Sequence, residues 1–374
     1  MEATKKLPYI DNLRLFVIML VVVMHLSLTY GGTGGWYYTE SRLLSGGEAT
    51  FFSFFQAFMQ AFMMGLLFLI SGYWAPGAYD TQGFGRFLKD SAVRLGLPVL
   101  LYMLVIGPFT EYMPGSHRPE QGFISFWAEN ITSLRVLSGT GPLWFALALL
   151  LLTVIYALIR RISGKARSSA KKPLNAAALV MLVPAIALLT FFARISFPIN
   201  AAAGIPLGHA TQYIVLFVAG IFAYRYNIFS RLNRSHIGLL YTAPLWGFGV
   251  WVALMMACQA FWSGDYSLFS GGLTCPSALY AFWESFTAAA MCVSLLALFK
   301  HWFNHQGRLT QKLSASAFAV YVFHAPVIVA ITLLFRPVDW APFLKFIVMT
   351  AVCLPVCLAI SYVLTRIPLL NKIL

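Results

Sequence analysis

Residues 13–30 read LRLFVIMLVVVMHLSLTY, an apolar run of the length that a membrane-spanning helix requires. A helix needs roughly 20 mostly apolar residues to cross the hydrocarbon core of a bilayer. The run carries one arginine, Arg14, near its start and one histidine, His25, near its end. We therefore predict that it is the first spanning helix of a membrane protein.

The residues around this run argue against a cleaved signal peptide. Lys5 and Lys6 precede the apolar residues as they would in a secretory signal. However, the charged residues Asp11 and Arg14 lie between these lysines and the apolar core, and no small-x-small cleavage site follows the core. The glycine-rich residues 31–35 are expected to form a flexible exit loop. We therefore predict that the run is a spanning helix and not a cleaved signal.

The whole sequence has the same apolar character. Of its 374 residues 60% are hydrophobic and only 10% are charged, whereas soluble chains are about 25% charged. We predict an all-α, polytopic integral membrane protein of about ten transmembrane helices, forming a single transmembrane domain over residues 1–374 with no fused soluble domain. The candidate spans are about 13–30, 54–75, 92–110, 141–159, 175–193, 209–226, 237–257, 278–299, 314–335 and 343–365.

The basic residues indicate the orientation of these helices. The formal net charge is +14, but the lysines and arginines are not gathered into one stripe or tail, so we expect membrane lipids and no nucleic acid as partners. The connections between successive predicted helices lie alternately on the two sides of the membrane. With this assignment, 20 of the 26 basic residues fall on one side. By the positive-inside rule both termini are cytoplasmic, as expected for a multi-pass protein of the inner (cytoplasmic) cell membrane.

Neither the cysteines nor the paired histidines predict a metal site. The five cysteines lie mostly within apolar segments and include no CxxC motif, which is typical of thiols packed in a protein core. His301 and His305 have the spacing of metal ligands on a helix, but no third ligand is evident in the sequence. We therefore predict no metal.

The first predicted helix carries ionisable groups, which are costly within a membrane. His25 follows Arg14 by eleven positions, so at about 100° per residue the two lie within about 20° of each other on one face. Asp11 lies within about 40° of the same face. Along the helix axis Arg14 and His25 are about 16 Å apart, which is close to the length of an extended pantetheine arm of about 15–20 Å.

This geometry predicts a site for an acyl-CoA. Arg14 would hold phosphates at the cytoplasmic end, and His25 would act as a base near the thioester, because an imidazole titrates near neutral pH. Other interpretations remain open for each residue taken alone. His25 could be a packing residue bonded to a backbone carbonyl, and Arg14 could be an orientation charge that reaches the membrane surface.

Several motifs resemble those of the membrane acyltransferase-3 family, whose members are integral-membrane O-acyltransferases. The stretch from Tyr9-Ile10-Asp11-Asn12-Leu13-Arg14 to His25 is similar to the family's first helix, where ten positions separate a basic residue from a catalytic histidine. Four further matches follow in family order: Phe68–Tyr73 (FLISGY), Arg94–Pro98 (RLGLP), Leu143–Phe145 (LWF) and Tyr321–Pro326 (YVFHAP).

The resemblance implies a transferase that moves an acyl group, usually acetyl, from cytoplasmic acyl-CoA to a hydroxyl of an extracytoplasmic glycan or other small acceptor. Acetyl-CoA would be the cosubstrate, and the product would be an O-acetylated polysaccharide or a similar acceptor. Residue by residue, the resemblance assigns catalysis to His25, contact with the CoA phosphates to Arg14 and Arg94, and a tunnel-lining role to Trp144.

The basic motif departs from the family at one position. Many members carry two arginines three residues apart before the proline, and the first of these corresponds to Ser91 here. Either Lys89 or Arg86 is expected to compensate, although a lysine cannot reproduce the bidentate fork of an arginine. Asp11 and Asn12, which belong to the first matching motif, are also expected near the acyl-CoA.

Two further ionisable residues are predicted to join the catalytic group. His324 lies in the middle of its predicted span, and Glu284 lies near the outer end of another, where a carboxylate could orient an imidazole. Tyr321 precedes His324 by three residues, so it shares a helix face with it and is expected to line the acyl-CoA site. The alternatives are a bridging hydrogen bond for His324 and an interfacial position for Glu284.

The aromatic residues after the glycine loop also have two interpretations. Trp36, Tyr37 and Tyr38 would stack on a sugar acceptor or would belong to the aromatic belt at the membrane surface.

A secondary transporter or exporter is the main alternative function. In that case Arg14, His25, Glu284 and His324 would line a path for a substrate or for protons. A transporter would show flux without acyl-CoA, whereas a transferase would consume acyl-CoA in a reaction that depends on His25. For the transferase we expect direct attack by the acceptor, with an acyl-histidine intermediate as the alternative.

Overall fold

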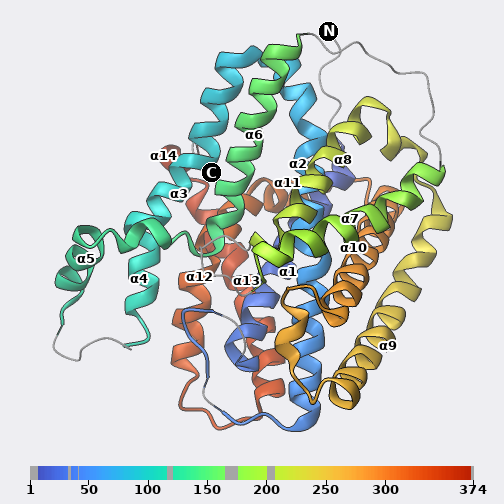
Figure 1. The fold of residues 1–374 in the computed structure, drawn as a ribbon. Coiled ribbons are helices and arrows are strands. Elements are labelled where there is room, and N and C mark those ends of the chain that lie inside the picture. Colours follow the sequence, from blue (N-terminus) through green and yellow to red (C-terminus); the bar gives the residue numbers. More distant parts are fainter. Residues whose placement is uncertain are drawn as a thin grey trace. The chain divides into compact units, whose positions relative to one another are not determined.

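The computed structural model describes residues 7–32, 35–40, 42–115, 121–164, 176–199 and 207–371. All regular structure in these ranges is helical, with no strand, as the sequence predicts (Figure 1). Most of the basic connection at 160–173 lies outside the described residues.

Eight helices in the described part of the chain are long and apolar enough to cross a membrane, which makes this a polytopic membrane protein. The number differs from the predicted ten for two reasons. The predicted spans at 54–75 and 92–110 lie within one continuous helical stretch, and the predicted span at 175–193 corresponds to the 21-residue helix Ala176–Ser196, whose described side chains give only the shorter apolar stretch Val183–Ser196. The eight are Pro8–Gly31, Gly46–Tyr112, Gly141–Ser163, Leu207–Arg225, Arg234–Phe261, Cys275–Trp302, Ala317–Leu334 and Pro342–Leu364.

The stretch Gly46–Tyr112 is too long for a single crossing. Its 67 residues would extend about 100 Å as a straight helix, more than three times the thickness of the hydrocarbon core of about 30 Å. Gly83 breaks it, because its φ of 74° and ψ of 172° are not helical and a positive φ costs glycine little. Each part is long enough for a crossing of its own, so the stretch accommodates both predicted spans.

The chain folds into two compact units that are interleaved in the sequence. The first unit contains Met1–Leu13, Phe58–Leu88 and Leu152–His305, and the second contains Arg14–Ala57, Lys89–Leu151 and Gln306–Leu374. Helices α1 (Pro8–Gly31), α2 (Gly46–Ser91) and α6 (Trp144–Ser163) contribute residues to both units.

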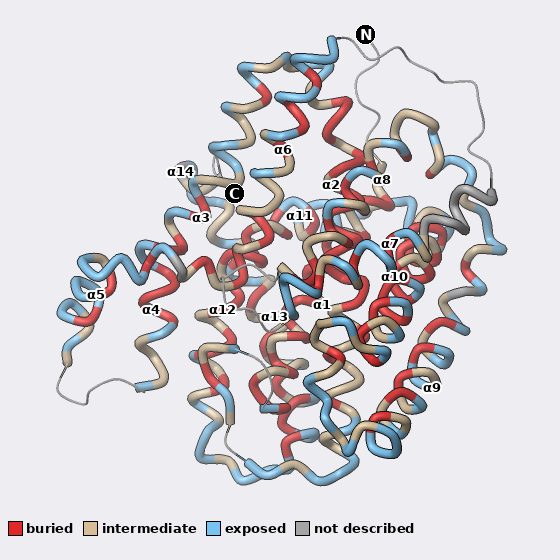
Figure 2. Tube along the Cα trace, in the orientation of Figure 1, coloured by how far each residue is buried: buried red, intermediate tan, exposed pale blue. Residues whose placement is uncertain are grey.

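The first unit is built around α10 (Cys275–Trp302), which packs against α7 (Ala176–Ser196) and α9 (Gly238–Phe261). Figure 2 shows that α10 is buried along much of its length, whereas α9 is exposed over long stretches. The exposed side chains of α9 include large apolar residues, as expected for a helix that faces lipid. They are Tyr241, Leu245, Trp246, Phe248, Met256 and Phe261.

A close contact between α2 and α8 (Ala210–Arg225) explains the glycine of the FLISGY motif. A Cβ atom added to Gly72 would lie 2.0 Å from the carbonyl oxygen of Phe217, and one added to Gly220 would lie 2.1 Å from that of Leu69. The two backbones therefore touch, as they do where small residues line the contact between membrane helices.

The second unit contains the later part of α1 and several further helical segments. They are the π-helical turns η1 (Ala92–Gly96) and η2 (Tyr102–Ile106), and the helices α3 (Leu97–Leu101), α4 (Gly107–Tyr112), α5 (Phe123–Thr132), α11 (Arg308–Ala315), α12 (Ala317–Leu334), α13 (Pro342–Leu364) and α14 (Pro368–Asn371). Helix α12 packs along α13 and also touches the short 3-10 turn Gly141–Leu143 and α4. It thereby carries the YVFHAP motif into the interior of the unit.

Candidate active site

Two histidines from distant parts of the sequence meet inside the second unit. His25 lies on α1 and His324 on α12, and Nε2 of His324 is 3.2 Å from Nδ1 of His25. The two ring centroids are 4.9 Å apart. His324 is fully buried, whereas His25 is half-buried. The structure thus brings together two of the three residues that the sequence predicts to be catalytic.

The backbone fixes the proton positions of both neutral rings. Nδ1 of His324 is 2.7 Å from the carbonyl oxygen of Tyr321, which can only accept, so this nitrogen carries the proton and Nε2 presents a lone pair. Nδ1 of His25 is 2.8 Å from the carbonyl oxygen of Val21, so it also carries a proton and donates to Val21 and to His324. The remaining nitrogen, Nε2 of His25, then holds a lone pair that can accept a proton.

Trp36 covers His25. The loop after α1 folds back on the helix, since the backbone N–H of Glu40 donates to the carbonyl oxygen of Thr29 at 2.8 Å. The indole ring of Trp36 lies 4.1 Å from the ring of His25 and 6.4 Å from that of His324, centroid to centroid. Its Nε1 is buried and has no hydrogen-bond partner among the described residues. The site therefore contains a buried N–H donor close to the imidazole of His25.

Three tyrosines hold the wall of this site in place. The hydroxyl of Tyr321 donates to the carbonyl oxygen of Pro142, and its ring lies 5.9 Å from that of His324. The hydroxyls of Tyr37 and Tyr102 are 3.0 Å apart. Burial raises the pKa of Tyr37 to about 12, although the hydrogen bond with Tyr102 opposes the shift, so its phenol stays protonated at neutral pH. Trp144, the predicted tunnel residue, begins α6 directly after the turn that contains Pro142.

Arg14 contacts the same C-terminal segment as His25 does. Its Nη2 donates to the carbonyl oxygen of Ser314 on α11 at 3.3 Å, and α12, which carries His324, follows α11 directly. Both residues lie on one uninterrupted helix, α1. The face of α1 that bears Arg14 and His25 is therefore turned toward α11 and α12.

The basic motif before Pro98 lies in a π-helical turn. Arg94 belongs to η1, and Ser91 precedes this turn as the last residue of α2. Arg94 and Lys89 are exposed, and neither has a hydrogen-bond or ion-pair partner among the residues that the structure describes. Single π-helical turns are frequent at functional sites. Neither cation is therefore engaged by another described residue.

Asn12, which the sequence places near the acyl-CoA, makes a structural contact. Its side-chain N–H groups donate to the carbonyl oxygens of Phe303 and His305 at 2.8 and 2.9 Å, within the first unit. Asp11 lies one residue earlier on α1, is half-buried and also belongs to the first unit. The amide of Asn12 therefore fastens the chain after α10 to the start of α1.

Glu284 lies in a buried charged cluster of the first unit. Its carboxylate pairs with the guanidinium of Arg194 from α7, and its Oε1 is 2.6 Å from Nδ1 of His209, which precedes α8. Arg194 also donates through Nε to the carbonyl oxygen of Gly208 at 2.9 Å. All three ionisable side chains are at least 95% buried. Both carboxylate oxygens of Glu284 therefore already have partners.

The sequence analysis did not identify Arg194 and His209. The available signal was the rarity of basic residues on the side that the charge distribution places outside, where Arg194 is one of only six. A basic residue on the outer side does not contribute to the orientation of the protein in the membrane. When it also lies beside an apolar run, it is a candidate for a buried ion pair.

The cysteines agree with the prediction of core thiols at four positions. All five lie in the described part and are free, and Cys258, Cys292, Cys353 and Cys357 are buried, whereas Cys275 at the start of α10 is exposed. His301, one of the two histidines with metal-ligand spacing, accepts a hydrogen bond from Arg234. Among the described residues, no three His, Cys, Asp or Glu side chains gather in a way that would hold a metal ion.

Comparison with known proteins gives a family and distant relatives. The sequence model of a family described as "Acyltransferase domain" matches residues 7–362. The chain is similar to glucans biosynthesis protein C of Shigella dysenteriae serotype 1 and of Escherichia coli (strain K12), each 24% identical over 168 residues. The alignment covers 44% of this chain and 41% of each relative, so the chain spans less than half the length of these relatives. No solved structure matches the chain.

Proposed function

Because the chain belongs to the acyltransferase-3 family, whose sequence model covers nearly all of it, we propose that it transfers an acyl group from acyl-CoA to a hydroxyl of an extracytoplasmic glycan. The name of the glucan-biosynthesis relatives supports a glycan as the acceptor. Within this proposal acetyl is the group transferred, the donor is cytoplasmic, and the protein resides in the inner membrane.

The proposal rests on the paired histidines of the second unit. A general base for a hydroxyl needs a free lone pair, and Nε2 of a neutral His25 provides one. His324 accepts from Nδ1–H of His25, so it holds the His25 ring in one tautomer and supports the positive charge that His25 gains on accepting a proton. This is the role that an orienting group plays beside other catalytic imidazoles.

The proposed reaction is a direct transfer. Nε2 of His25 takes the proton of the acceptor hydroxyl while the hydroxyl oxygen forms a bond with the thioester carbonyl carbon. The tetrahedral intermediate then collapses, the carbon–sulfur bond breaks, and the departing CoA thiolate takes the proton from His25. The products are an ester on the acceptor and free CoA thiol, so protons and electrons balance with no further reactant.

Trp36 has the chemistry to stabilise the intermediate. Negative charge develops on the thioester oxygen, and a positioned N–H donor in a site that excludes water lowers the energy of that charge. The buried Nε1–H of Trp36 has no described partner that competes for it, and the indole ring lies against His25. We therefore assign Trp36 Nε1–H as the oxyanion donor.

The cations of the second unit supply the contacts for CoA. Arg14 lies about 16 Å from His25 along α1, a distance that a pantetheine arm can cover. Arg94 and Lys89 are exposed and unpaired among the described residues, as expected for groups that bind phosphates from solution.

Release of CoA thiol by the purified protein in detergent tests the proposal. Wild type should release CoA from acetyl-CoA when a glucan acceptor is added, and His25→Ala should slow this release by at least about 100-fold, the lower end of a general-base contribution. Thermal unfolding of His25→Ala must match wild type so that misfolding is excluded. Absence of CoA release by wild type, together with substrate flux into vesicles that need no acyl-CoA, would support the transporter instead.

Ser91 gives a gain-of-function test for the phosphate contact. Ser91→Arg restores the second arginine of the family motif, three residues before Arg94 and thus on the same helix face. We expect the KM for acetyl-CoA to fall about tenfold, or ~1.4 kcal/mol, which is modest for a charge-assisted contact because the site is exposed. Ser91→Gln is the matched control and should leave KM unchanged. An unchanged KM in Ser91→Arg would argue against phosphate binding at this turn.

A further inference from the structure

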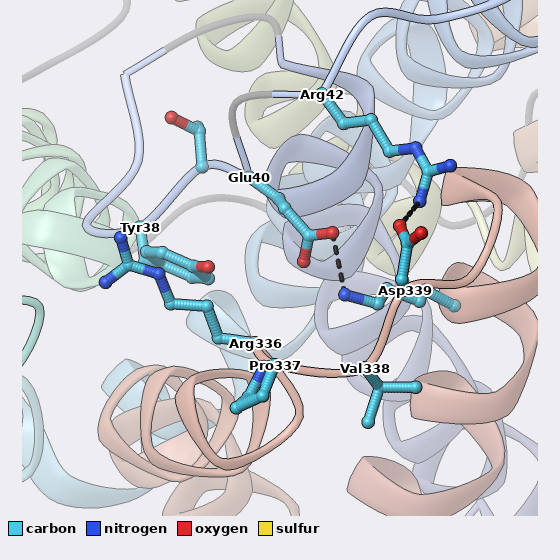
Figure 3. Close-up of a pocket in the computed structure, with 9 residues that line it drawn as sticks. Tyr38, Glu40, Arg42, Arg336, Pro337, Val338 and Asp339 are labelled. Carbon is cyan, nitrogen blue, oxygen red and sulfur yellow. Dashed lines mark hydrogen bonds and ion pairs between the residues drawn. The ribbon is translucent and has the colours of Figure 1, made fainter.

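A polar pocket of about 470 Å³ lies in the second unit, apart from the histidine pair (Figure 3). The loop after α1 provides one wall, and the connection between α12 and α13 provides the other. Ion pairs join the two walls: Nζ of Lys345 is 2.7 Å from Oε1 of Glu40, and Nη1 of Arg42 is 2.5 Å from Oδ1 of Asp339. The lining residues are Tyr38, Thr39, Glu40, Arg42, Arg336, Pro337, Val338, Asp339 and Lys345.

The charges of the pocket do not balance. Three basic residues face two acidic ones, and the two ion pairs use Lys345 and Arg42. Arg336 is left without a hydrogen-bond or ion-pair partner for its side chain among the described residues. In Figure 3 its guanidinium lies beside the ring of Tyr38. The pocket therefore offers an unpaired fork of N–H donors, whose best complement is a carboxylate or a phosphoryl group.

The same pocket offers groups that bind hydroxyls. Oε2 of Glu40 is buried and has no described hydrogen-bond partner, so it can accept from an O–H group. Burial raises the pKa of Tyr38, the nearby Glu40 adds to the shift and Arg336 opposes it, so the phenol remains a donor at neutral pH. A buried carboxylate oxygen without a partner is costly, and a sugar hydroxyl would satisfy it.

Two short stretches of chain join the walls of the pocket to residues of the proposed catalytic site. Tyr38 follows Trp36 by two residues, so at most about 7 Å of backbone separates the pocket wall from the ring that covers His25. Along α12, about 15 Å of helix separates His324 from Leu334, the last residue before the pocket connection. An acceptor bound in the pocket could thus extend to His25 if it is longer than a single sugar.

We propose that this pocket binds an acidic sugar unit of the acceptor, with its carboxylate or phosphoryl group on Arg336 and a hydroxyl on Glu40. This inference rests on the proposed transfer to a glycan and specifies that the acceptor carries negative charge. Selection between acceptors then occurs at Arg336, at a distance from the base that activates the reacting hydroxyl.

Binding of small sugars to the purified full chain tests the pocket without relying on catalysis. The probes are glucuronate, glucose 6-phosphate and uncharged glucose, titrated in detergent and followed by saturation-transfer NMR. Wild type should bind at least one acidic sugar about tenfold or more tightly than glucose, and Arg336→Gln should abolish this preference. The two acidic probes distinguish a carboxylate from a phosphoryl group as the recognised charge. Arg135→Gln, which removes an exposed arginine of the same unit outside the pocket, should bind like wild type.

Two results would overturn the inference. One is equal affinity of wild type for glucose and for both acidic sugars, and the other is an unchanged preference in a folded Arg336→Gln protein. Neither result depends on turnover. A failure of the proposed sugar binding is therefore distinguishable from a failure of the proposed reaction, which is judged by CoA release. If the proposed sugar binding and the proposed reaction are both correct, Arg336→Gln should also raise the KM for acidic acceptors while the KM for acetyl-CoA stays unchanged.

Discussion

At the scale of single residues, His324 is a positioning group for the proposed base. It accepts from Nδ1–H of His25 through Nε2, and this contact can be removed or imitated by substitution. We expect His324→Leu to lower kcat by about 10- to 100-fold, as loss of a group that orients a functional imidazole does elsewhere. His324→Gln, whose side-chain oxygen can still accept, should recover much of the rate.

The kinetic pattern separates this role from a merely structural one. The KM for acetyl-CoA should be the same in wild type, His324→Leu and His324→Gln, since His324 does not contact the donor in the proposed reaction. Equal rates for His324→Leu and wild type would show that the contact between the two imidazoles has no part in the reaction.

Trp36 allows a test of the oxyanion donor. Trp36→Phe keeps an aromatic ring over His25 but removes the indole N–H, so kcat should fall by about 100-fold while KM changes little. Trp127→Phe makes the same change on α5, where the indole N–H donates to the carbonyl oxygen of Leu104, and it should keep the rate of wild type. A Trp36→Phe enzyme with full kcat would place the oxyanion donor elsewhere.

The residues of the site differ in how far the sequence could predict them. Arg14 and His25 are related by helix geometry alone, which depends only on their separation in one apolar run. The position of Trp36 depends on a loop that folds back through the contact between Glu40 and Thr29, and no local pattern encodes this. The sequence therefore left open whether Trp36 faces lipid or a sugar, and the structure places it on His25.

At the scale of helices, the cluster of Glu284, Arg194 and His209 links α7, the start of α8 and α10. Removing one member of a buried ion pair leaves an uncompensated charge, which costs about 3–5 kcal/mol. We therefore expect Arg194→Met and Glu284→Leu each to lower the thermal unfolding temperature in detergent markedly. The double variant should recover much of the loss, because no buried charge remains.

This experiment also decides what Glu284 does. Arg135→Met, in an exposed pair with Glu129, is the control and should change stability little. If Arg194→Met and Glu284→Leu both unfold at the wild-type temperature, the buried cluster does not stabilise the fold. If Glu284→Gln keeps wild-type stability yet loses transfer, then Glu284 takes part in catalysis as the sequence predicts.

At the scale of the whole molecule, composition and periodicity predict an all-helical membrane protein because lipid imposes the same pattern on every span. The number of spans is harder to predict. The stretch Gly46–Tyr112 is helical on both sides of Gly83, and the break at this glycine is a backbone conformation that hydropathy does not report. The division into two interleaved units also arises from contacts between segments far apart in the sequence.

The polar pocket could not be predicted from the sequence for the same reason. Glu40 and Lys345 pair across about 300 positions, and so do Arg42 and Asp339. The sequence distinguishes Lys345 only as one of the six basic residues that the charge distribution assigns to the outer side. Its pairing with Glu40 accounts for a nearly fully buried lysine at the start of α13.

The most direct test of the account follows the acyl group across a membrane. Sealed vesicles containing the protein receive labelled acetyl-CoA on the cytoplasmic face and a glucan only on the opposite face. We predict that label appears on the glucan with wild type and that His25→Ala, inserted to the same level, transfers none above background. Label that stays on CoA with wild type, or that reaches the glucan equally well with His25→Ala, would contradict transfer at the histidine pair.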